Sequence, residues 1–129
     1  MIYTGMMPGE LLRLKVDNID LDNRQIVGAG MKTKVRRKTA ISIAEYIVPV
    51  ILSLIAQSKN GKIVTCSRDT FYVEYHQHIE AAGVRDLPPY SCRHTTATAL
   101  AIGENIAPEV IRKVMRWSTT KMLSRYAHP

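Results

Sequence analysis

The chain has 129 residues, enough to bury the core of one domain without a disulfide or a structural metal. Its 18 Lys and Arg residues outnumber its 11 Asp and Glu residues, which gives a formal net charge of +7 and an isoelectric point near 9.7. This balance favours an anionic partner, most often a nucleic acid. The sequence has neither an apolar run of about 20 residues, as a membrane helix requires, nor the regions of a signal peptide.

The first segments predict a helix and a basic hairpin. Pro8 and Glu10 suit the first turn of a helix that continues to Lys15, and residues 17–23 have the composition of a polar turn. β-branched residues then flank a basic stretch, which predicts two strands over residues 24–29 and 39–43 with the charges on the strands and their loop.

The middle of the chain predicts a second helix and a short strand. Apolar residues at helical spacing cover residues 43–57, and Pro49 either kinks or starts this helix. Asn60 and Gly61 end it, and residues 63–65 are a candidate third strand.

The remaining sequence is helical in pattern. One predicted helix ends at Gly83 and carries an apolar face. A second runs from about Ser91 to Ile102, after Pro88-Pro89, and a third follows Pro108 through Met115. The residues expected to share the face of the first of these helices are Tyr72, Tyr75, Ile79 and Ala82.

The two cysteines, Cys66 and Cys92, have no CxxC or paired Cys/His spacing around them. The sequence therefore indicates neither a zinc site nor a disulfide framework. We expect two reduced thiols in a cytoplasmic protein.

Three segments match a known pattern in their order and spacing: TGMMPGELLRLKVDNIDL (4–21), YSCRHTTATAL (90–100) and VMRWSTTKMLSRYAHP (114–129). Together they resemble the motifs of tyrosine recombinases of the phage-integrase type. The basic stretch MKTKVRRKTAIS falls where that family has its lysine-bearing β-hairpin. The resemblance covers nearly the whole chain. It implies one catalytic domain over residues 1–129, with an α+β, mostly helical fold and a small antiparallel sheet of about three strands.

The chemistry implied by this resemblance is DNA strand exchange. A tyrosine oxygen attacks a phosphodiester, which gives a 3′-phosphotyrosyl bond and a free 5′-hydroxyl, so the strand is rejoined without a nucleotide cofactor. The resemblance implies no metal and no other cofactor. Transition-state charge on the nonbridging oxygens is met by fixed cations and donors, typically two Arg plus His, Lys or Trp.

Tyr126 is the nucleophile that the resemblance implies, and Arg93 is the second catalytic arginine, whose guanidinium can hold a phosphate through two hydrogen bonds. Without the motif, Tyr126 would be interpreted as an aromatic anchor and Arg93 as a surface arginine. His94 is expected to point away from the site and to have a structural role, because neighbours on a helix do not share a face.

Three further positions of the family's site are filled by Tyr90, Trp117 and Glu10. Tyr90 stands where the family most often has His, and a phenol can donate a hydrogen bond but is a poor base at neutral pH. Trp117 matches a position that holds His or, in some members, Trp, and its indole N–H can only donate. Glu10 resembles an acidic residue that orients the guanidinium groups. The alternatives are packing for Tyr90, core filling for Trp117 and a first-turn helix glutamate for Glu10.

The basic stretch supplies the candidate catalytic lysine. In the family one hairpin lysine protonates the departing 5′-oxygen. The Lys-Thr pair makes Lys32 the better candidate, with Lys34 behind it. Phosphate contact without chemistry is the plainer interpretation for most of these charges. The predicted DNA-binding residues are Lys32, Lys34, Arg36, Arg37 and Lys38.

Met7 departs from the pattern, because the family usually has its first catalytic arginine there. A thioether offers neither a charge nor an N–H donor. Loss of one transition-state donor costs about 2.7–4 kcal/mol, on the order of 10² to 10³ in rate. Either the chain is an altered recombinase that still binds DNA, or a nearby cation such as Arg36 or Arg37 takes over. On the sequence alone we favour the first interpretation, which predicts that Met7→Arg increases strand cleavage.

The resemblance implies site-specific recombination or integration, as in a mobile element or prophage, by a bacterial or phage-encoded protein acting on the chromosome. The implied partner is double-stranded DNA, with a homotetramer on DNA in the full-length protein and no membrane. Neither a core-binding domain nor a C-terminal tail is recognised, so we expect a fragment. The alternatives are an inactive DNA-binding module derived from an integrase and a helical interaction domain without affinity for nucleic acid.

Overall fold

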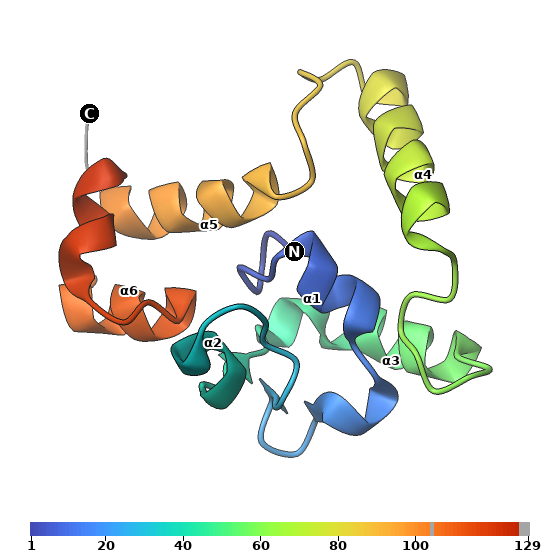
Figure 1. Cartoon of the computed structure of the whole chain (residues 1–129), viewed down its shortest axis with the longest axis horizontal. Helices are drawn as coiled ribbons and strands as arrows, with labels where there is room; N and C mark the ends of the chain where they lie inside the picture. The colour runs from blue at the N-terminus through green and yellow to red at the C-terminus, as the bar shows by residue number, and fades with distance from the viewer. Residues whose placement is uncertain (104, 127–129) are drawn as a thin grey trace.

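The computed structural model describes residues 1–103 and 105–126 and is mostly helical (Figure 1). Its α-helices are α1 (Pro8–Arg13), α2 (Lys34–Lys38), α3 (Val48–Gln57), α4 (Arg68–Ala81), α5 (Ser91–Ile102) and α6 (Pro108–Met115). Short 3-10 helices are η1 (Val16–Asn18), η2 (Glu45–Ile47) and η3 (Thr120–Arg125), and the strands are β1 (Ile19–Asp20), β2 (Gln25–Ile26) and β3 (Ile41–Ser42). The predicted α+β fold is therefore confirmed.

None of the helices in the described ranges combines the length and the apolar character needed to cross a membrane.

The sheet has three antiparallel strands in the order β1-β2-β3, as predicted, but not all of its strands are the expected ones. Ile26 in β2 pairs with Ile19 in β1 and with Ile41 in β3. β1 arises within the segment predicted to be a polar turn. The predicted strand at residues 63–65 is wrong, because only an isolated bridge between Lys15 and Lys62 forms beside it.

The predicted hairpin forms, because β2 and β3 lie within the two expected strand segments and pair antiparallel. The basic stretch between them differs from the prediction, since it folds as α2 instead of extending the strands and their loop. Thr33 caps this helix, and its Oγ1 accepts a hydrogen bond from the Arg36 amide at 3.1 Å. Gly30 makes the close approach of α2 possible, because a Cβ atom there would lie 1.8 Å from the Arg36 carbonyl oxygen. The Thr33 cap and the close approach at Gly30 explain why the segment between β2 and β3 is helical, and the β-branched flanks do not signal either of them.

The helix starts follow the sequence signals closely. α1 begins at Pro8 as predicted, although it ends at Arg13 rather than Lys15. Pro49 lies in the first turn of α3, so it starts that helix rather than kinking it. α5 and α6 have the predicted bounds.

α4 stands apart from the other helices in Figure 1. It begins at Arg68, where the Ser67 hydroxyl accepts a hydrogen bond from the Thr70 amide at 3.2 Å. The predicted apolar face is only half-buried at Tyr72, Tyr75 and Ile79, and Ala82 is exposed. No residue within the helix is fully buried.

Two apolar cores hold the described part of the molecule together. The first, here called the N-terminal core, packs α1 and α3 against the sheet and comprises Met6, Leu14, Ile26, Ala29, Ile41, Ile43, Ile51 and Ile63. The second, the C-terminal core, is centred on Ala97, Ile111 and Met115, with Leu100, Ile106, Trp117, Leu123 and Tyr126 packed around it. The segment that precedes α1 lies between these cores, and a Cβ atom on Gly5 would lie 3.5 Å from the Met115 sulfur.

Candidate active site

A pocket of about 300 Å³ lies where the two cores meet. Met7 borders it before α1, Thr33 and Arg36 from α2, and Arg93 and His94 from α5. The segment after α6 and η3 complete the lining with Arg116, Trp117, Ser118, Met122 and Tyr126. Three of the predicted catalytic residues, Arg93, Trp117 and Tyr126, thus meet in one place together with Met7.

Tyr126 is held by aromatic neighbours. Its ring stacks on Trp117 with centroids 5.8 Å apart and planes inclined by 13°. Its hydroxyl lies 2.6 Å from Nδ1 of His94. The His94 ring in turn meets the edge of Tyr90 at 5.6 Å between centroids. The phenol is therefore fixed beside a basic nitrogen, while Tyr90 lies behind His94 and does not line the pocket.

The expectation that His94 points away from the site is wrong. Arg93 and His94 do lie on different faces of α5, as the helix geometry requires. Arg93 turns into the interior, however, and His94 is the one that reaches Tyr126. Helix geometry separates the two side chains, but it does not say which of the two faces of α5 meets Tyr126.

Arg93 ties the two cores together. Its terminal nitrogens donate hydrogen bonds to the Gly5 carbonyl oxygen at 2.8 Å and to that of Met115. Burial lowers the pKa of Arg93 to about 10, with smaller contributions from the nearby Arg116 and Arg36 charges. The guanidinium stays protonated at neutral pH and keeps N–H groups beyond the two that it donates to the carbonyls.

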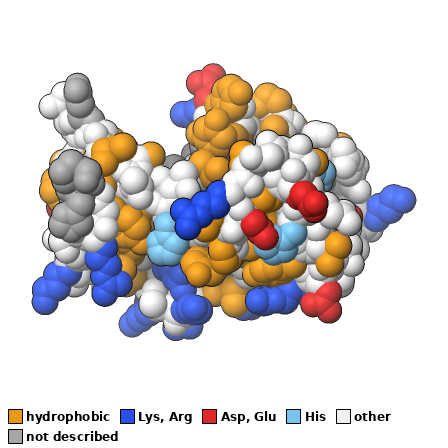
Figure 2. All heavy atoms as spheres, turned by 90° about the horizontal axis from the view of Figure 1, so that it is seen from above, with side chains coloured by type: hydrophobic (Ala, Val, Ile, Leu, Met, Phe, Trp, Pro, Cys, Tyr) orange, Lys and Arg blue, Asp and Glu red, His pale blue; other side chains and the backbone are white. Residues whose placement is uncertain are grey.

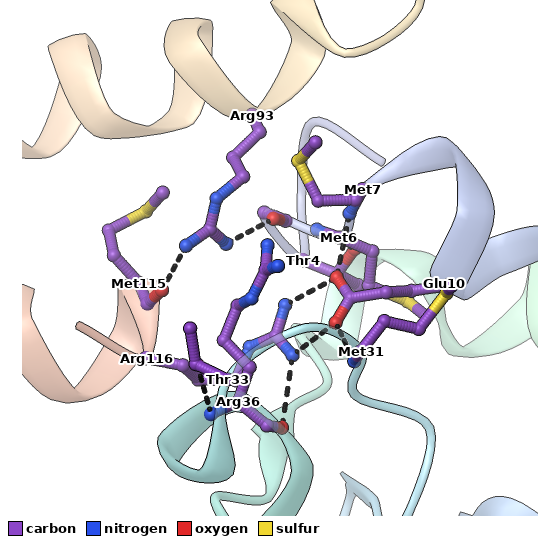
Figure 3. A network of polar contacts seen from close by, with 11 residues as sticks. Thr4, Met6, Met7, Glu10, Met31, Thr33, Arg36, Arg93, Met115 and Arg116 are labelled. Carbon is purple, nitrogen blue, oxygen red and sulfur yellow. Dashed lines mark hydrogen bonds and ion pairs between the residues drawn. The ribbon is translucent and has the colours of Figure 1, made fainter. Parts of the chain in front are cut away.

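Glu10 and Arg116 form a fully buried ion pair beneath the pocket (Figure 3). The two terminal nitrogens of Arg116 donate to the two carboxylate oxygens, each at 2.8 Å. The amides of Met7 and Met31 donate to the same oxygens at 2.8 and 3.0 Å. Burial alone would raise the pKa of Glu10, but these hydrogen bonds outweigh it and hold the pKa below its ordinary value. Glu10 thus fixes the orientation of the Arg116 guanidinium.

Arg116 itself was not predicted from the sequence. It follows α6 in a left-handed conformation, with φ 57° and ψ 43°, which directs its side chain under the pocket. The signal available was its position beside Trp117 in the third matched motif, and nothing local predicts that an arginine there is buried.

The model of the phage integrase family matches residues 1–129. The chain belongs to the phage integrase family. The predicted resemblance is therefore confirmed.

Relatives of known sequence and structure agree with this assignment. A Pseudomonas aeruginosa protein described as a tyrosine recombinase XerC is 28% identical over 76% of this chain and 27% of its own length. The Tn1549 transposon integrase, in complex with circular intermediate DNA, matches 99% of this chain and 51% of its own with a TM-score of 0.81 and 17% identity. XerA recombinase matches 99% of this chain and 49% of its own with a TM-score of 0.75 and 22% identity. The chain thus spans from a quarter to half the length of these relatives.

The candidate lysines do not join this integrase pocket. Lys32 and Lys34 are exposed, and neither lines the pocket that holds Tyr126. Lys32 has a φ of 69°, so the backbone turns sharply just before Thr33 and α2. The structure therefore leaves the catalytic lysine of this chain unassigned.

The other predicted DNA-binding residues divide by burial. Arg37 and Lys38 are exposed, whereas Arg36 is buried and borders the pocket. Figure 2 shows one face of the molecule, with several Lys and Arg side chains along its lower edge. In the described ranges, no three His, Cys, Asp or Glu side chains lie close enough together to hold a metal ion.

Proposed function

We propose that residues 1–129 form the catalytic domain of a tyrosine recombinase, which cleaves and rejoins DNA through a transient 3′-phosphotyrosyl bond to Tyr126. The observation that supports this most is the Tyr126 hydroxyl 2.6 Å from His94 Nδ1, in a pocket bordered by Arg36, Arg93 and Arg116. A nucleophile beside a base and beside fixed positive charge is the arrangement that phosphoryl transfer requires.

The proposed cleavage begins when the Tyr126 oxygen attacks the phosphorus of the scissile phosphodiester. His94 accepts the phenolic proton at Nδ1, in the tautomer that carries hydrogen on Nε2. An O–P bond forms to Tyr126 and the bond from phosphorus to the 5′-oxygen breaks. The departing oxygen takes up a proton, for which Lys32 remains the proposed donor once DNA draws its exposed side chain towards the pocket.

Two further groups stabilise the charge that develops on the nonbridging oxygens. Arg93 donates the N–H groups that it does not use for the Gly5 and Met115 carbonyls. Trp117, stacked on the nucleophile, donates its indole N–H. Rejoining reverses these steps when a 5′-hydroxyl attacks the phosphotyrosyl bond, so the bond energy is conserved without a cofactor.

The proposed substrate is double-stranded DNA at a specific site in a mobile element or prophage, in the cytoplasm of a bacterium. In the full-length protein we propose a homotetramer assembled on DNA. The solved structures of the Tn1549 integrase and of XerH, which has a TM-score of 0.74 at 20% identity over 99% of this chain and 40% of its own, contain DNA according to their descriptions. They support DNA as the partner.

The test is covalent capture of DNA. The chain is incubated with a nicked duplex from which the cleaved strand end diffuses away, and the adduct is detected by denaturing electrophoresis. We expect an adduct with the native chain and none with Tyr126→Phe, while DNA binding stays unchanged. Tyr46→Phe is the matched control, because Tyr46 is 77% exposed and lies outside the pocket. An adduct that persists in Tyr126→Phe would refute the assignment.

The alternative is a DNA-binding module that has lost its chemistry. Met7 at the position of the first arginine and Lys32 outside the pocket favour it. In that case the native chain binds the nicked duplex with normal affinity and forms no adduct at any time, even when an integrase of known activity forms one under the same conditions.

A further inference from the structure

The pocket contains more positive charge than the described residues around it neutralise. Three guanidinium groups, those of Arg36, Arg93 and Arg116, border it, and Glu10 is the carboxylate beneath them. Two positive charges are left without a carboxylate partner among the described residues. Buried charges without partners are unfavourable, so this arrangement is complete only when an anion enters the pocket.

Glu10 cannot neutralise a second arginine. Each of its oxygens already accepts two hydrogen bonds, one from Arg116 and one from a backbone amide, of Met7 for Oε1 and of Met31 for Oε2. A carboxylate offers about four acceptor sites, and all of them are filled. Glu10 therefore cannot also form an ion pair with Arg36.

Arg36 is the unpartnered member of the cluster. Its side chain is 8% exposed, and its guanidinium makes no hydrogen bond or ion pair within residues 1–103 and 105–126. Burial lowers the pKa of the Arg36 guanidinium. In Figure 3 the side chain rises from α2 into the space between Arg93 and Glu10, next to Met7. Arg36 and Met7 thus border the same pocket.

We propose that Arg36 binds the scissile phosphate and supplies the guanidinium that position 7 lacks in this chain. The proposal rests on the proposed function, because it assigns a catalytic residue to that reaction. A guanidinium can hold two phosphate oxygens at once. Arg36 and Arg93 then approach the phosphate from α2 and α5, in the pocket that Trp117 and Tyr126 also line.

This assignment changes what Met7→Arg should do. If the site lacks a cation, restoring an arginine at position 7 raises cleavage on the order of 10² to 10³. If Arg36 already fills that role, the same change in the native chain adds less than about tenfold, and its large effect appears only when Arg36 is removed. The geometry therefore favours the interpretation in which Arg36 replaces the missing arginine over the one in which the site has lost a cation.

The direct test is anion binding to the chain itself. Inorganic phosphate is titrated against the fluorescence of Trp117, the single tryptophan, which lines the same pocket. We expect Arg36→Met to weaken phosphate binding about tenfold or more. Arg13→Met is the matched control, because Arg13 is exposed at the end of α1 and does not line the pocket, and its affinity should equal that of the native chain.

Stability separates a binding role from a structural one. Methionine keeps the apolar stem of Arg36 and removes a buried charge, so the urea midpoint of Arg36→Met should stay the same or rise. A purely structural arginine gives the opposite result: a lower midpoint with phosphate affinity unchanged. That pair of results, or equal phosphate affinity in Arg36→Met and Arg13→Met, overturns the proposal.

Cleavage of the nicked duplex supplies a second readout. Arg36→Met should reduce the rate of adduct formation by a factor on the order of 10² or more. Adding Met7→Arg to this variant should raise the rate again by at least about tenfold. If the native chain forms no adduct, the proposed function fails. The phosphate titration still decides whether Arg36 binds the anion, so the two failures remain distinct.

Discussion

Arg116 is the residue with the most unusual environment in this molecule. Its backbone is left-handed, a conformation that costs a residue with a side chain roughly 1–3 kcal/mol relative to an ordinary one. Its guanidinium is nevertheless fully buried and bound on both terminal nitrogens by Glu10. The ion pair holds the strained backbone in place, and it also joins α1 to the end of α6. The left-handed conformation thus directs the Arg116 guanidinium to the pocket, where it pairs with Glu10.

Removing the charge of Glu10 should therefore be strongly destabilising. Glu10→Gln keeps the shape but leaves Arg116 buried without a counter-charge, and we expect a loss of about 3–5 kcal/mol in the free energy of unfolding. Urea denaturation at pH 7 measures it. Glu109→Gln is the control, because Glu109 pairs with Arg112 at the surface and its loss should cost less than about 1 kcal/mol. Equal losses in the two variants would contradict this account.

The same pair predicts the response to acid. The pKa of Glu10 is lowered on folding, so the stability that it contributes is present above its ordinary pKa of about 4.3 and is lost as the pH falls below that value. Unfolding of the native chain at pH 7, 5, 4 and 3 should show this loss, and Glu10→Gln should show a shallower one.

The sequence predicted which residues meet at the site better than it predicted how they are oriented. Tyr126, Arg93 and Trp117 were found by their positions in the matched motifs, and all three line the pocket. The contact of His94 with Tyr126 depends on where η3 packs against α5, and the burial of Arg36 depends on where α2 packs. Neither can be read from neighbouring residues, because both are set by contacts between distant segments.

At the scale of elements, α2 shows the clearest limit of pattern analysis. The proline starts of α1, α3 and α6 are local signals, and the structure confirms them. α2 has five residues, four of them basic, and no apolar periodicity. Its position depends on Gly30, which lets the chain pass close to the Arg36 carbonyl, and on Arg116, which donates a hydrogen bond to that carbonyl at 3.4 Å. The helix is thus fixed by tertiary contacts that a local pattern does not contain.

Gly30→Ala should displace α2 and the arginine that it carries. The new Cβ atom would lie 1.8 Å from the Arg36 carbonyl oxygen, which is backbone and cannot rotate away, so we expect a loss of about 1–3 kcal/mol in stability together with weaker phosphate binding. Gly61→Ala is the control. Gly61 has a positive φ of 78° but nothing within 4 Å of its Cβ position, so alanine there strains the backbone far from α2. Gly61→Ala should lower stability and leave phosphate binding unchanged; a loss of binding in both variants would indicate general unfolding instead.

At the scale of the whole molecule, the site is the junction of two cores. Arg93 joins Gly5 to Met115, and the Glu10–Arg116 pair joins α1 to the end of α6. The nucleophile belongs to the C-terminal core, whereas Arg36 and Met7 come from elements packed on the N-terminal core. The proposed reaction therefore requires the two cores to keep their relative position. The exposed charges of α2 lie close to the same pocket, because Arg36 of this helix lines it, and we expect DNA to approach there.

That placement predicts which charges determine the salt dependence of DNA binding. Lys34 and Arg37 are exposed on α2, so the double variant Lys34→Gln/Arg37→Gln should lose two phosphate contacts. The slope of log K against log salt should then become shallower by about 1.8, at roughly 0.9 for each contact. Lys59→Gln/Lys62→Gln removes the same charge from the exposed loop after α3, which in Figure 1 lies across the molecule from α2, and should leave the slope unchanged. Long-range attraction depends on the total charge, whereas counterion release depends only on the cations that contact phosphates. Equal changes in the two double variants would therefore mean that net charge, and not the face that carries α2, governs DNA binding.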